Sequence, residues 1–287
     1  MTVADAAASC VLRFRCPDRP GILALVTPLL SSAGWDIREA AIYGDPDSVT
    51  FFVRMELASM SASIAELRAS MPELADTLQL DWEIHDLHRP VPALIAVSKF
   101  HHCLVDLIHK SEIGQLPIRI VGVVSNHETA RALVEWHGLP FHHLPVDRSD
   151  KTAQEKRFLD VIRESGAELT ILARYMQILS DDFANALVGR CINIHHSFLP
   201  SFKGAKPYHQ AKARGVKLIG ATAHYVTSEL DEGPIIEQDA RRVTHATSAE
   251  EMVAIGREVE ASVLSRAVRW HAEHRVLPNG NQTVVLA

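Results

Sequence analysis

The sequence has few cysteines and no long apolar run. Its four cysteines, Cys10, Cys16, Cys103 and Cys191, form neither CxxC pairs nor a regular framework, which argues against a disulfide scaffold and favours reduced thiols. The start of the chain lacks the basic segment and apolar stretch of a secretion signal. No segment approaches the roughly 18 consecutive apolar residues that would cross a bilayer. We therefore expect a cytoplasmic protein without a membrane partner.

The chain also carries only a small net charge. The chain has 29 Lys and Arg against 35 Asp and Glu, for a net charge of −6. This balance argues against a general nucleic-acid surface but allows a local basic pocket, and the expected partner is a small molecule. Apolar residues are abundant, at 47% of 287 residues. That content supports a large buried core in one or two domains.

The first third of the chain predicts a small unit of alternating strands and helices. Strand patterns are expected at 9–16, 35–43, 49–57 and 80–85, with helices at 22–30 and 62–79. Pro28 lies inside the first helical pattern and is expected to kink or split it. The resulting order, βαββαβ, is that of a ferredoxin-like fold of about 85 residues.

Residues 18–37, reading DRPGILALVTPLLSSAGWDI, resemble the opening of an ACT domain. In many proteins ACT domains bind amino acids and pair with copies of themselves. Over residues 1–88 the resemblance implies a homo-oligomer, a dimer or tetramer, and an amino-acid effector site. The equal alternative is a domain that only holds subunits together, because a fold alone does not fix a function.

The prolines of Arg89-Pro90-Val91-Pro92 favour an extended path and predict a linker at 89–92. A second domain is expected over 93–287. Its apolar runs at 93–98, 118–124 and 169–173 alternate with helical patterns at 104–113, 125–138 and 154–165. Such alternation predicts an open, mostly parallel α/β sheet. Sheets of this class bind ligands beyond the carboxyl ends of their strands.

The strand CINIHHSFLP places an amide and an imidazole two residues apart. Side chains alternate along a strand, so Asn193 and His195 are expected on one face, with Ile192 and Ile194 directed into packing. An amide donor beside an imidazole that can carry a proton suits an acyl-transfer site, where a carbonyl oxygen becomes an oxyanion. The same alternation predicts that His196 faces away from His195.

Downstream, a loop reads Asp231-Glu-Gly-Pro-Ile-Ile. Together with Asn193 and His195, this loop resembles the folate-dependent formyltransferase and hydrolase family, and the resemblance extends from residue 92 onward. It implies that Asn193, His195 and Asp231 are catalytic. It also implies that folate is the substrate and that no further cofactor is required.

The segment ARYMQILS resembles the family's loop whose backbone binds the pterin ring of folate. The resemblance carries this role to Met176, Gln177, Ile178 and Leu179. A pterin edge is a row of donors and acceptors that main-chain groups can complement. Apolar side chains of this kind also fill protein cores, and for Ile178 burial in the core is the expected alternative.

Two more residues are candidates for contact with the substrate. Gly204 and Tyr208 lie in the loop that follows the Asn193 strand, and loops at strand ends are common places for sites. For Tyr208 the equal alternative is a solvent-facing loop residue. His224 shares a strand face with Thr222, and support of the site and simple packing are both possible for it.

Three features favour the hydrolases of the family. The first is the His195-His196 doublet, where purine-pathway transferases carry His-Pro, and the second is the ACT-like domain. The third is the segment Ser98-Lys-Phe-His-His-Cys103, which lacks the glycines needed to wrap a phosphate. The resemblance thus implies hydrolysis of 10-formyltetrahydrofolate to formate and tetrahydrofolate, which balances one-carbon pools and supplies formate for purine synthesis. Formyl transfer to an amine acceptor and folate sensing are the alternatives.

The sequence contains 16 histidines, several of them in doublets. Adjacent histidines on a strand diverge, and no HxxxH or HExxH pattern supplies ligands that converge on one ion. We therefore expect no metal site.

Overall fold

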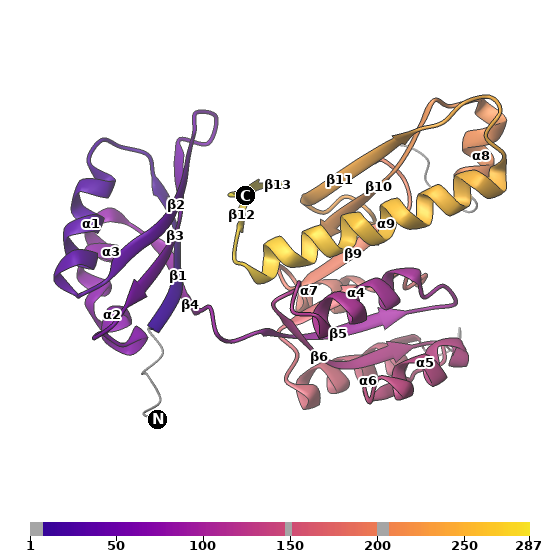
Figure 1. Cartoon of the computed structure of the whole chain (residues 1–287), viewed down its shortest axis with the longest axis horizontal. Helices are drawn as coiled ribbons and strands as arrows, with labels where there is room; N and C mark the ends of the chain where they lie inside the picture. Colours follow the sequence, from indigo (N-terminus) through magenta and orange to yellow (C-terminus); the bar gives the residue numbers. More distant parts are fainter. Residues whose placement is uncertain (1–7, 147–150, 200–206) are drawn as a thin grey trace. The chain divides into compact units, whose positions relative to one another are not determined.

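The computed structural model describes residues 8–146, 151–199 and 207–287. It divides the chain into two units (Figure 1): Met1–Arg89 together with Glu273–Ala287, and Pro90–Ala272. The sequence predicted a second domain over 93–287, and the structure assigns the C-terminal end of that range to the first unit instead. In the described residues no helix is both long and apolar enough to span a membrane.

The first unit has the predicted βαββαβ order, with the second helical segment in two pieces. Its elements are β1 Ala8–Pro17, α1 Ile22–Ser32, β2 Asp36–Asp45, β3 Thr50–Ser59, α2 Ile64–Ser70, α3 Pro72–Leu78 and β4 Asp81–Asp86. Pro72 ends α2 and starts α3, since proline suits a first helical turn but not a helix interior. The helix α1 continues through Pro28, so the predicted split is absent.

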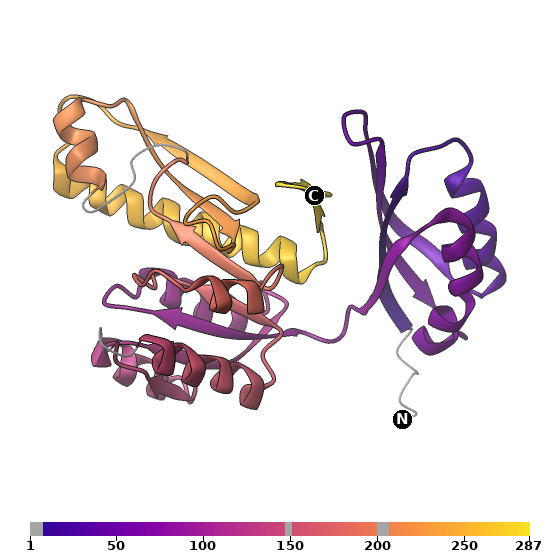
Figure 2. The same ribbon diagram turned by 180° about the vertical axis from the view of Figure 1, so that it is seen from behind.

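The four strands form an antiparallel sheet in the order β2-β3-β1-β4. Figures 1 and 2 show α1, α2 and α3 on one face of this sheet. Alternate residues of β1, including Leu12 and Phe14, are buried in the core against those helices. The fold class of this unit therefore agrees with the sequence pattern.

A C-terminal hairpin also belongs to this unit. Its strands, β12 Val276–Asn279 and β13 Gln282–Val285, pair around a turn at residues 280–281. Leu277 and Leu286 form a small apolar cluster with Phe52 of β3. Asn279 donates a hydrogen bond of 2.9 Å to Asp45 at the end of β2. These contacts explain why the end of the chain joins the first unit.

Arg54 of β3 is buried in the first unit, with 1% of its surface exposed. Its Nε donates to the Glu273 carbonyl at 3.1 Å. Its Nη atoms lie 3.4 Å from Glu39 and 3.6 Å from Glu56. The guanidinium is thus surrounded by acceptors from the sheet and from the C-terminal segment.

The second unit is a seven-stranded α/β sheet in the order β11-β10-β9-β8-β5-β6-β7. Its elements are β5 Val91–Val97, α4 His102–Glu112, β6 Ile118–Ser125, η1 Glu128–Ala130, α5 Arg131–Trp136, β7 Phe141–His143, α6 Lys151–Ser165, β8 Leu169–Leu172, α7 Asp181–Ala186, β9 Cys191–His195, α8 Pro207–Arg214, β10 Leu218–Tyr225, β11 Ile235–Arg242 and α9 Ala249–Ala272. Strands β5 to β9 are parallel, whereas β10 and β11 run antiparallel to their neighbours. This is the mostly parallel sheet that the sequence predicted.

Two boundaries differ from the sequence prediction. Val91 and Pro92 are the first residues of β5 and not part of a linker, because the Val91 amide donates to Pro117 and the Pro92 carbonyl accepts from Glu168. Ser125 ends β6 and does not cap the next helix. That helix starts instead as the single turn η1.

The strand order changes direction between β5 and β8. From β5 the chain builds β6 and β7 on one side, then crosses to build β8, β9, β10 and β11 on the other. A reversal of this kind leaves a crevice at the carboxyl ends of the two central strands, where α/β sheets bind ligands. The long helix α9 packs along β9, β10 and β11 (Figure 2).

Candidate active site

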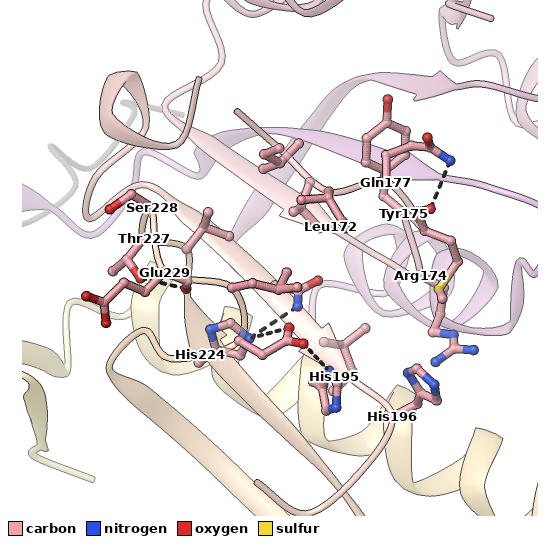
Figure 3. Close-up of a pocket in the computed structure, with 18 residues that line it drawn as sticks. Leu172, Arg174, Tyr175, Gln177, His195, His196, His224, Thr227, Ser228 and Glu229 are labelled. Carbon is pink, nitrogen blue, oxygen red and sulfur yellow. Dashed lines mark hydrogen bonds and ion pairs between the residues drawn. The ribbon is translucent and has the colours of Figure 1, made fainter. Parts of the chain in front are cut away.

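A cavity of about 360 Å³ lies at the carboxyl ends of β8 and β9. Three segments line it: the loop after β8, the end of β9, and the end of β10 with the loop that follows. Figure 3 shows their side chains directed toward one another around the cavity. Asn193, His195 and Asp231 all line it, although Asp231 lies far from the other two in the sequence.

His195 and Asp231 are in direct contact. The Nδ1 atom of His195 lies 3.2 Å from Oδ2 of Asp231, and His195 has only 7% of its surface exposed. The other ring nitrogen, Nε2, is buried and has no hydrogen-bond partner among the described residues. A buried imidazole nitrogen without a partner is available to a bound substrate.

Asn193 is oriented by His224 on the neighbouring strand. The antiparallel register of β9 and β10 places the two residues opposite each other, and their Nδ2 and Nε2 atoms are 3.2 Å apart. The Nδ1 atom of His224 is 2.9 Å from the Tyr225 carbonyl, which can only accept a hydrogen bond. Nδ1 therefore carries a proton, and Nε2 faces both the Asn193 amide and Oδ1 of Asp231, which is 3.8 Å away. The second amide hydrogen of Asn193 remains available to a ligand.

Asp231 occupies a tight loop between β10 and β11. Its φ is 57°, in the left-handed region that Asp tolerates better than most residues. Two residues later, a Cβ at Gly233 would collide with the Tyr225 carbonyl and press against His224. Glycine at position 233 therefore lets the loop approach β10 closely enough to bring Asp231 to His195.

Hydrogen bonding controls the charge of Asp231. Burial alone would raise the pKa of its carboxyl group, but the hydrogen bond from His195, assisted by the nearby His224, more than compensates. The pKa of Asp231 is thus held well below its ordinary value. The carboxylate therefore stays ionised at neutral pH beside His195.

The loop after β8 provides one wall of the cavity. Met176, Gln177, Ile178 and Leu179, the predicted pterin-loop residues, all line it. Ile178 is 64% exposed, so the alternative of a core residue is wrong for it; the strand has already ended at Leu172 and the chain has left the packed layers. The backbone of this loop is fixed by Ser98, whose hydroxyl accepts from the Met176 amide at 3.1 Å.

Three other predicted positions have different outcomes. Gly204 lies outside the described residues. Tyr208 is buried, donates to Glu260 at 2.7 Å and lines a second cavity, so it is neither in the Asn193 cavity nor in solvent. His196 does not face away from His195: their ring centroids are 5.1 Å apart, because β9 ends at His195 and strand alternation stops there.

The sequence pattern gave no role to Ser98 or Arg174 and left His224 open between support of the site and simple packing. Arg174 lines both cavities. The alternation in β10 indicated that His224 shares a face with Thr222, but the antiparallel register that sets it opposite Asn193 had no signal in the sequence.

One group of potential metal ligands occurs in the described residues. Atoms of His102, Cys103 and Glu260 lie within 4.8 Å of one another. Burial raises the pKa of Cys103 well above its ordinary value, so its sulfur carries a proton. Glu260 is already bound by His102 at 2.8 Å and by Tyr208. These features favour a hydrogen-bonded cluster over a metal site.

Comparisons with known proteins agree with this geometry. Residues 92–268 match the family model described as formyl transferase. A formyltetrahydrofolate deformylase of Corynebacterium sp. (strain P-1) is 50% identical over 278 residues, which are 96% of this chain and 97% of the relative.

Solved structures show the same relationship. The crystal structure of a formyltetrahydrofolate deformylase from Burkholderia mallei has a TM-score of 0.93 at 48% identity, covering 98% of this chain and all of the other. A glycinamide ribonucleotide transformylase from Symbiobacterium toebii has a TM-score of 0.63 at 28% identity and covers 69% of this chain and 95% of its own. The chain therefore belongs to the formyltetrahydrofolate deformylase family.

Proposed function

We propose that the chain hydrolyses 10-formyltetrahydrofolate to formate and tetrahydrofolate. The observation that carries the proposal is the meeting of Asn193, His195 and Asp231 at one cavity of about 360 Å³. An amide donor, an imidazole and an ionised carboxylate are the groups that water needs to attack a formyl carbon. The relatives of nearly equal length carry the name of this activity.

The pterin ring enters along the loop of residues 176–179, whose main-chain groups complement its edge. The formyl oxygen then lies against the free amide hydrogen of Asn193 and Nε2 of protonated His195. Both donors are oriented before the substrate binds, Asn193 by its contact with His224 and His195 by its contact with Asp231. Each well-placed donor to the oxyanion contributes about 3–4 kcal/mol to transition-state stabilisation.

Water attacks the formyl carbon, and Asp231 accepts its proton as the carbon–oxygen bond forms. Negative charge collects on the formyl oxygen beside Asn193 and His195. The proton passes to N10, the bond between N10 and carbon breaks, and the products are tetrahydrofolate and formate with release of one proton.

Formyl transfer to an amine is the alternative activity. The segment from Ser98 to Cys103 lacks the glycines of a phosphate-wrapping loop. Purified protein incubated with 10-formyltetrahydrofolate and no acceptor is expected to release formate and tetrahydrofolate in equal amounts. Dependence of turnover on an added amine, with a formylated amine as product, would contradict hydrolysis.

We also propose that the first unit is an ACT domain that supports a cytoplasmic homo-oligomer and binds an amino-acid effector. Its βαββαβ order and the segment starting at Asp18 support the ACT assignment. The free state of all four cysteines of the chain supports the cytoplasmic location. The test is light scattering of the purified protein together with formate release measured against each common amino acid. A monomer whose activity ignores every amino acid would contradict it.

A further inference from the structure

Arg174 lies between the Asn193 cavity and a second cavity of about 280 Å³, and lines both. The two cavities also share Met176 and His196. Figure 3 shows the guanidinium of Arg174 next to His196, at the end of the first cavity away from His224. A cation at this place adjoins the groups that surround the formyl carbon.

The guanidinium is buried but not fully bonded. Arg174 has 9% of its surface exposed, and its Nε lies 3.3 Å from Glu260. Its Nη1 atom is buried and has no hydrogen-bond partner in the part of the chain that the structure describes. An ionised nitrogen left without an acceptor in such a place costs free energy of folding. An acceptor from a bound ligand would remove that cost.

The backbone at Arg174 is also strained. Its φ is 66°, in the left-handed region, which is unfavourable for a residue with a Cβ. The preceding residue, Ala173, is fixed to β5 by a hydrogen bond from its amide to the Ala96 carbonyl at 2.8 Å. The chain therefore turns sharply just after the carboxyl end of β8, and Arg174 lines the two cavities there.

Among the described residues, the neighbours of Arg174 offset its charge but leave its Nη1 without a hydrogen-bond acceptor. Glu260 is the carboxylate next to it, but the same group also binds His102 at 2.8 Å and Tyr208 at 2.7 Å. His196 has its pKa lowered to about 4 by burial and by the charge of Arg174, so it is neutral at pH 7. On the other side, the ring of Phe100 lies 5.9 Å from the guanidinium carbon. The place next to Arg174 therefore offers a hydrogen-bond donor to a small ligand that can accept, such as a carboxylate.

We propose that Arg174 binds the formate that hydrolysis releases, with Nη1 donating to the product carboxylate at the junction of the two cavities. This inference rests on the proposed function. A planar guanidinium suits a planar carboxylate, which it can hold with two parallel hydrogen bonds. The subsite takes the product away from Asn193 and His195, which frees them for the next substrate.

The first test measures binding of formate alone to the full-length protein, through saturation transfer to the formate proton in NMR. Arg174→Gln is expected to weaken formate binding at least tenfold. Arg174→Lys should weaken it less, because lysine keeps the charge but lacks the two parallel N–H donors of the guanidinium. The matched control is Arg163→Gln, which removes the same charge from an exposed position on α6 that lines neither cavity and is expected to change the affinity less than threefold. Equal formate affinity in the wild type and Arg174→Gln would overturn the proposal.

A second measurement needs no variant, in case Arg174→Gln does not fold. Formate and tetrahydrofolate should bind the wild-type protein together, since the subsite is next to the pterin cavity and not inside it. Mutual exclusion of the two would overturn the proposal. Neither experiment requires turnover. Absence of hydrolysis with Arg174-dependent formate binding therefore refutes only the proposed function, whereas hydrolysis without such binding refutes only the subsite.

Discussion

Each unit of the molecule buries an arginine, and the two arginines differ in what surrounds them. Arg54 of the first unit is almost fully enclosed and is met by Glu39, Glu56 and the Glu273 carbonyl. Arg174 of the second unit has a left-handed backbone and a buried nitrogen with no acceptor among the residues that the structure describes. The described residues thus supply acceptors to the first arginine but leave one nitrogen of the second without any.

Two other groups at the site resemble Arg174. His195 keeps a buried nitrogen with no hydrogen-bond partner in the described part of the chain, and Asp231 has a left-handed backbone. Strain and unmet hydrogen bonds persist only where the surrounding structure enforces them, and they gather at sites that do chemistry. The comparison predicts that changes in the second unit's polar groups lower turnover, while changes at Arg54 lower stability.

The largest effect is expected from Asp231→Asn, which keeps the shape of the side chain and removes the proton acceptor. We expect kcat to fall about 10³-fold, within the range for loss of a general base, with binding of tetrahydrofolate retained. The matched control is Asp160→Asn, which breaks only an exposed pair with Arg163. If the rate of formate release by Asp231→Asn stays within tenfold of wild type, Asp231 is not the proton acceptor.

Asn193→Ala should lower kcat about 10²-fold, because one donor to the oxyanion is lost. KM should change little, since the donor acts mainly in the transition state. Steady-state formate release measures both constants. A change confined to KM would show that Asn193 binds the ground state only.

Arg54→Met tests the other side of the comparison. Removing a buried guanidinium with charged partners is expected to lower the free energy of unfolding of the first unit by about 2 kcal/mol. Urea unfolding measures this change, and kcat per folded molecule should stay within twofold of wild type. Arg38→Met, at an exposed pair with Asp36, is the control and should change stability little. A large loss of kcat in Arg54→Met would contradict the prediction that Arg54 serves stability and not turnover.

Gly233→Ala should lower kcat about tenfold, because a displacement of roughly 1 Å at a catalytic group already has a cost of this order or more. The added methyl group cannot fit against the Tyr225 carbonyl, so the loop moves away from β10 and takes Asp231 with it. Steady-state kinetics test this prediction. Unchanged kcat would show that the loop can shift without moving the carboxylate.

The smallest effect concerns His196 and pH. Its pKa in the folded protein is about 4, below the ordinary 6.5, so the unfolded chain takes up the proton first as the pH falls. Stability linked to His196 is complete above pH 6.5 and is lost progressively down to about pH 4. Between pH 7.5 and 5.5 the wild type should therefore lose about 1 kcal/mol more stability than His196→Gln.

Urea unfolding at the two pH values measures that difference. The exposed residue His101 provides the control, and His101→Gln should behave as the wild type. Equal losses in the wild type and His196→Gln would show that His196 is not buried as a neutral group.

Much of this arrangement could be predicted from local pattern. Apolar runs and helical spacing gave both sheets, and strand alternation set Asn193 and His195 on one face. Asp231 came only from the family resemblance, because nothing local links a loop at 231 to a strand at 193. Its catalytic role remains a prediction.

The remaining features depend on contacts between distant segments. His224 meets Asn193 through the register of β9 and β10, and His196 turns toward the cavity because the strand stops one residue earlier. Tyr208 is buried because Gly256 of α9 leaves room for its ring, which a Cβ would fill. Such positions depend on tertiary packing, which propensity and periodicity do not encode.

The C-terminal hairpin makes the first unit discontinuous in sequence, with practical results for dissection of the protein. A fragment that stops at Arg89 would uncover Phe52 and deprive Arg54 of the Glu273 carbonyl. Residues 90–272 form one uninterrupted piece, so excision of the catalytic half is the simpler operation. A free N-terminal half should be made with residues 273–287 fused after residue 89 through a short spacer.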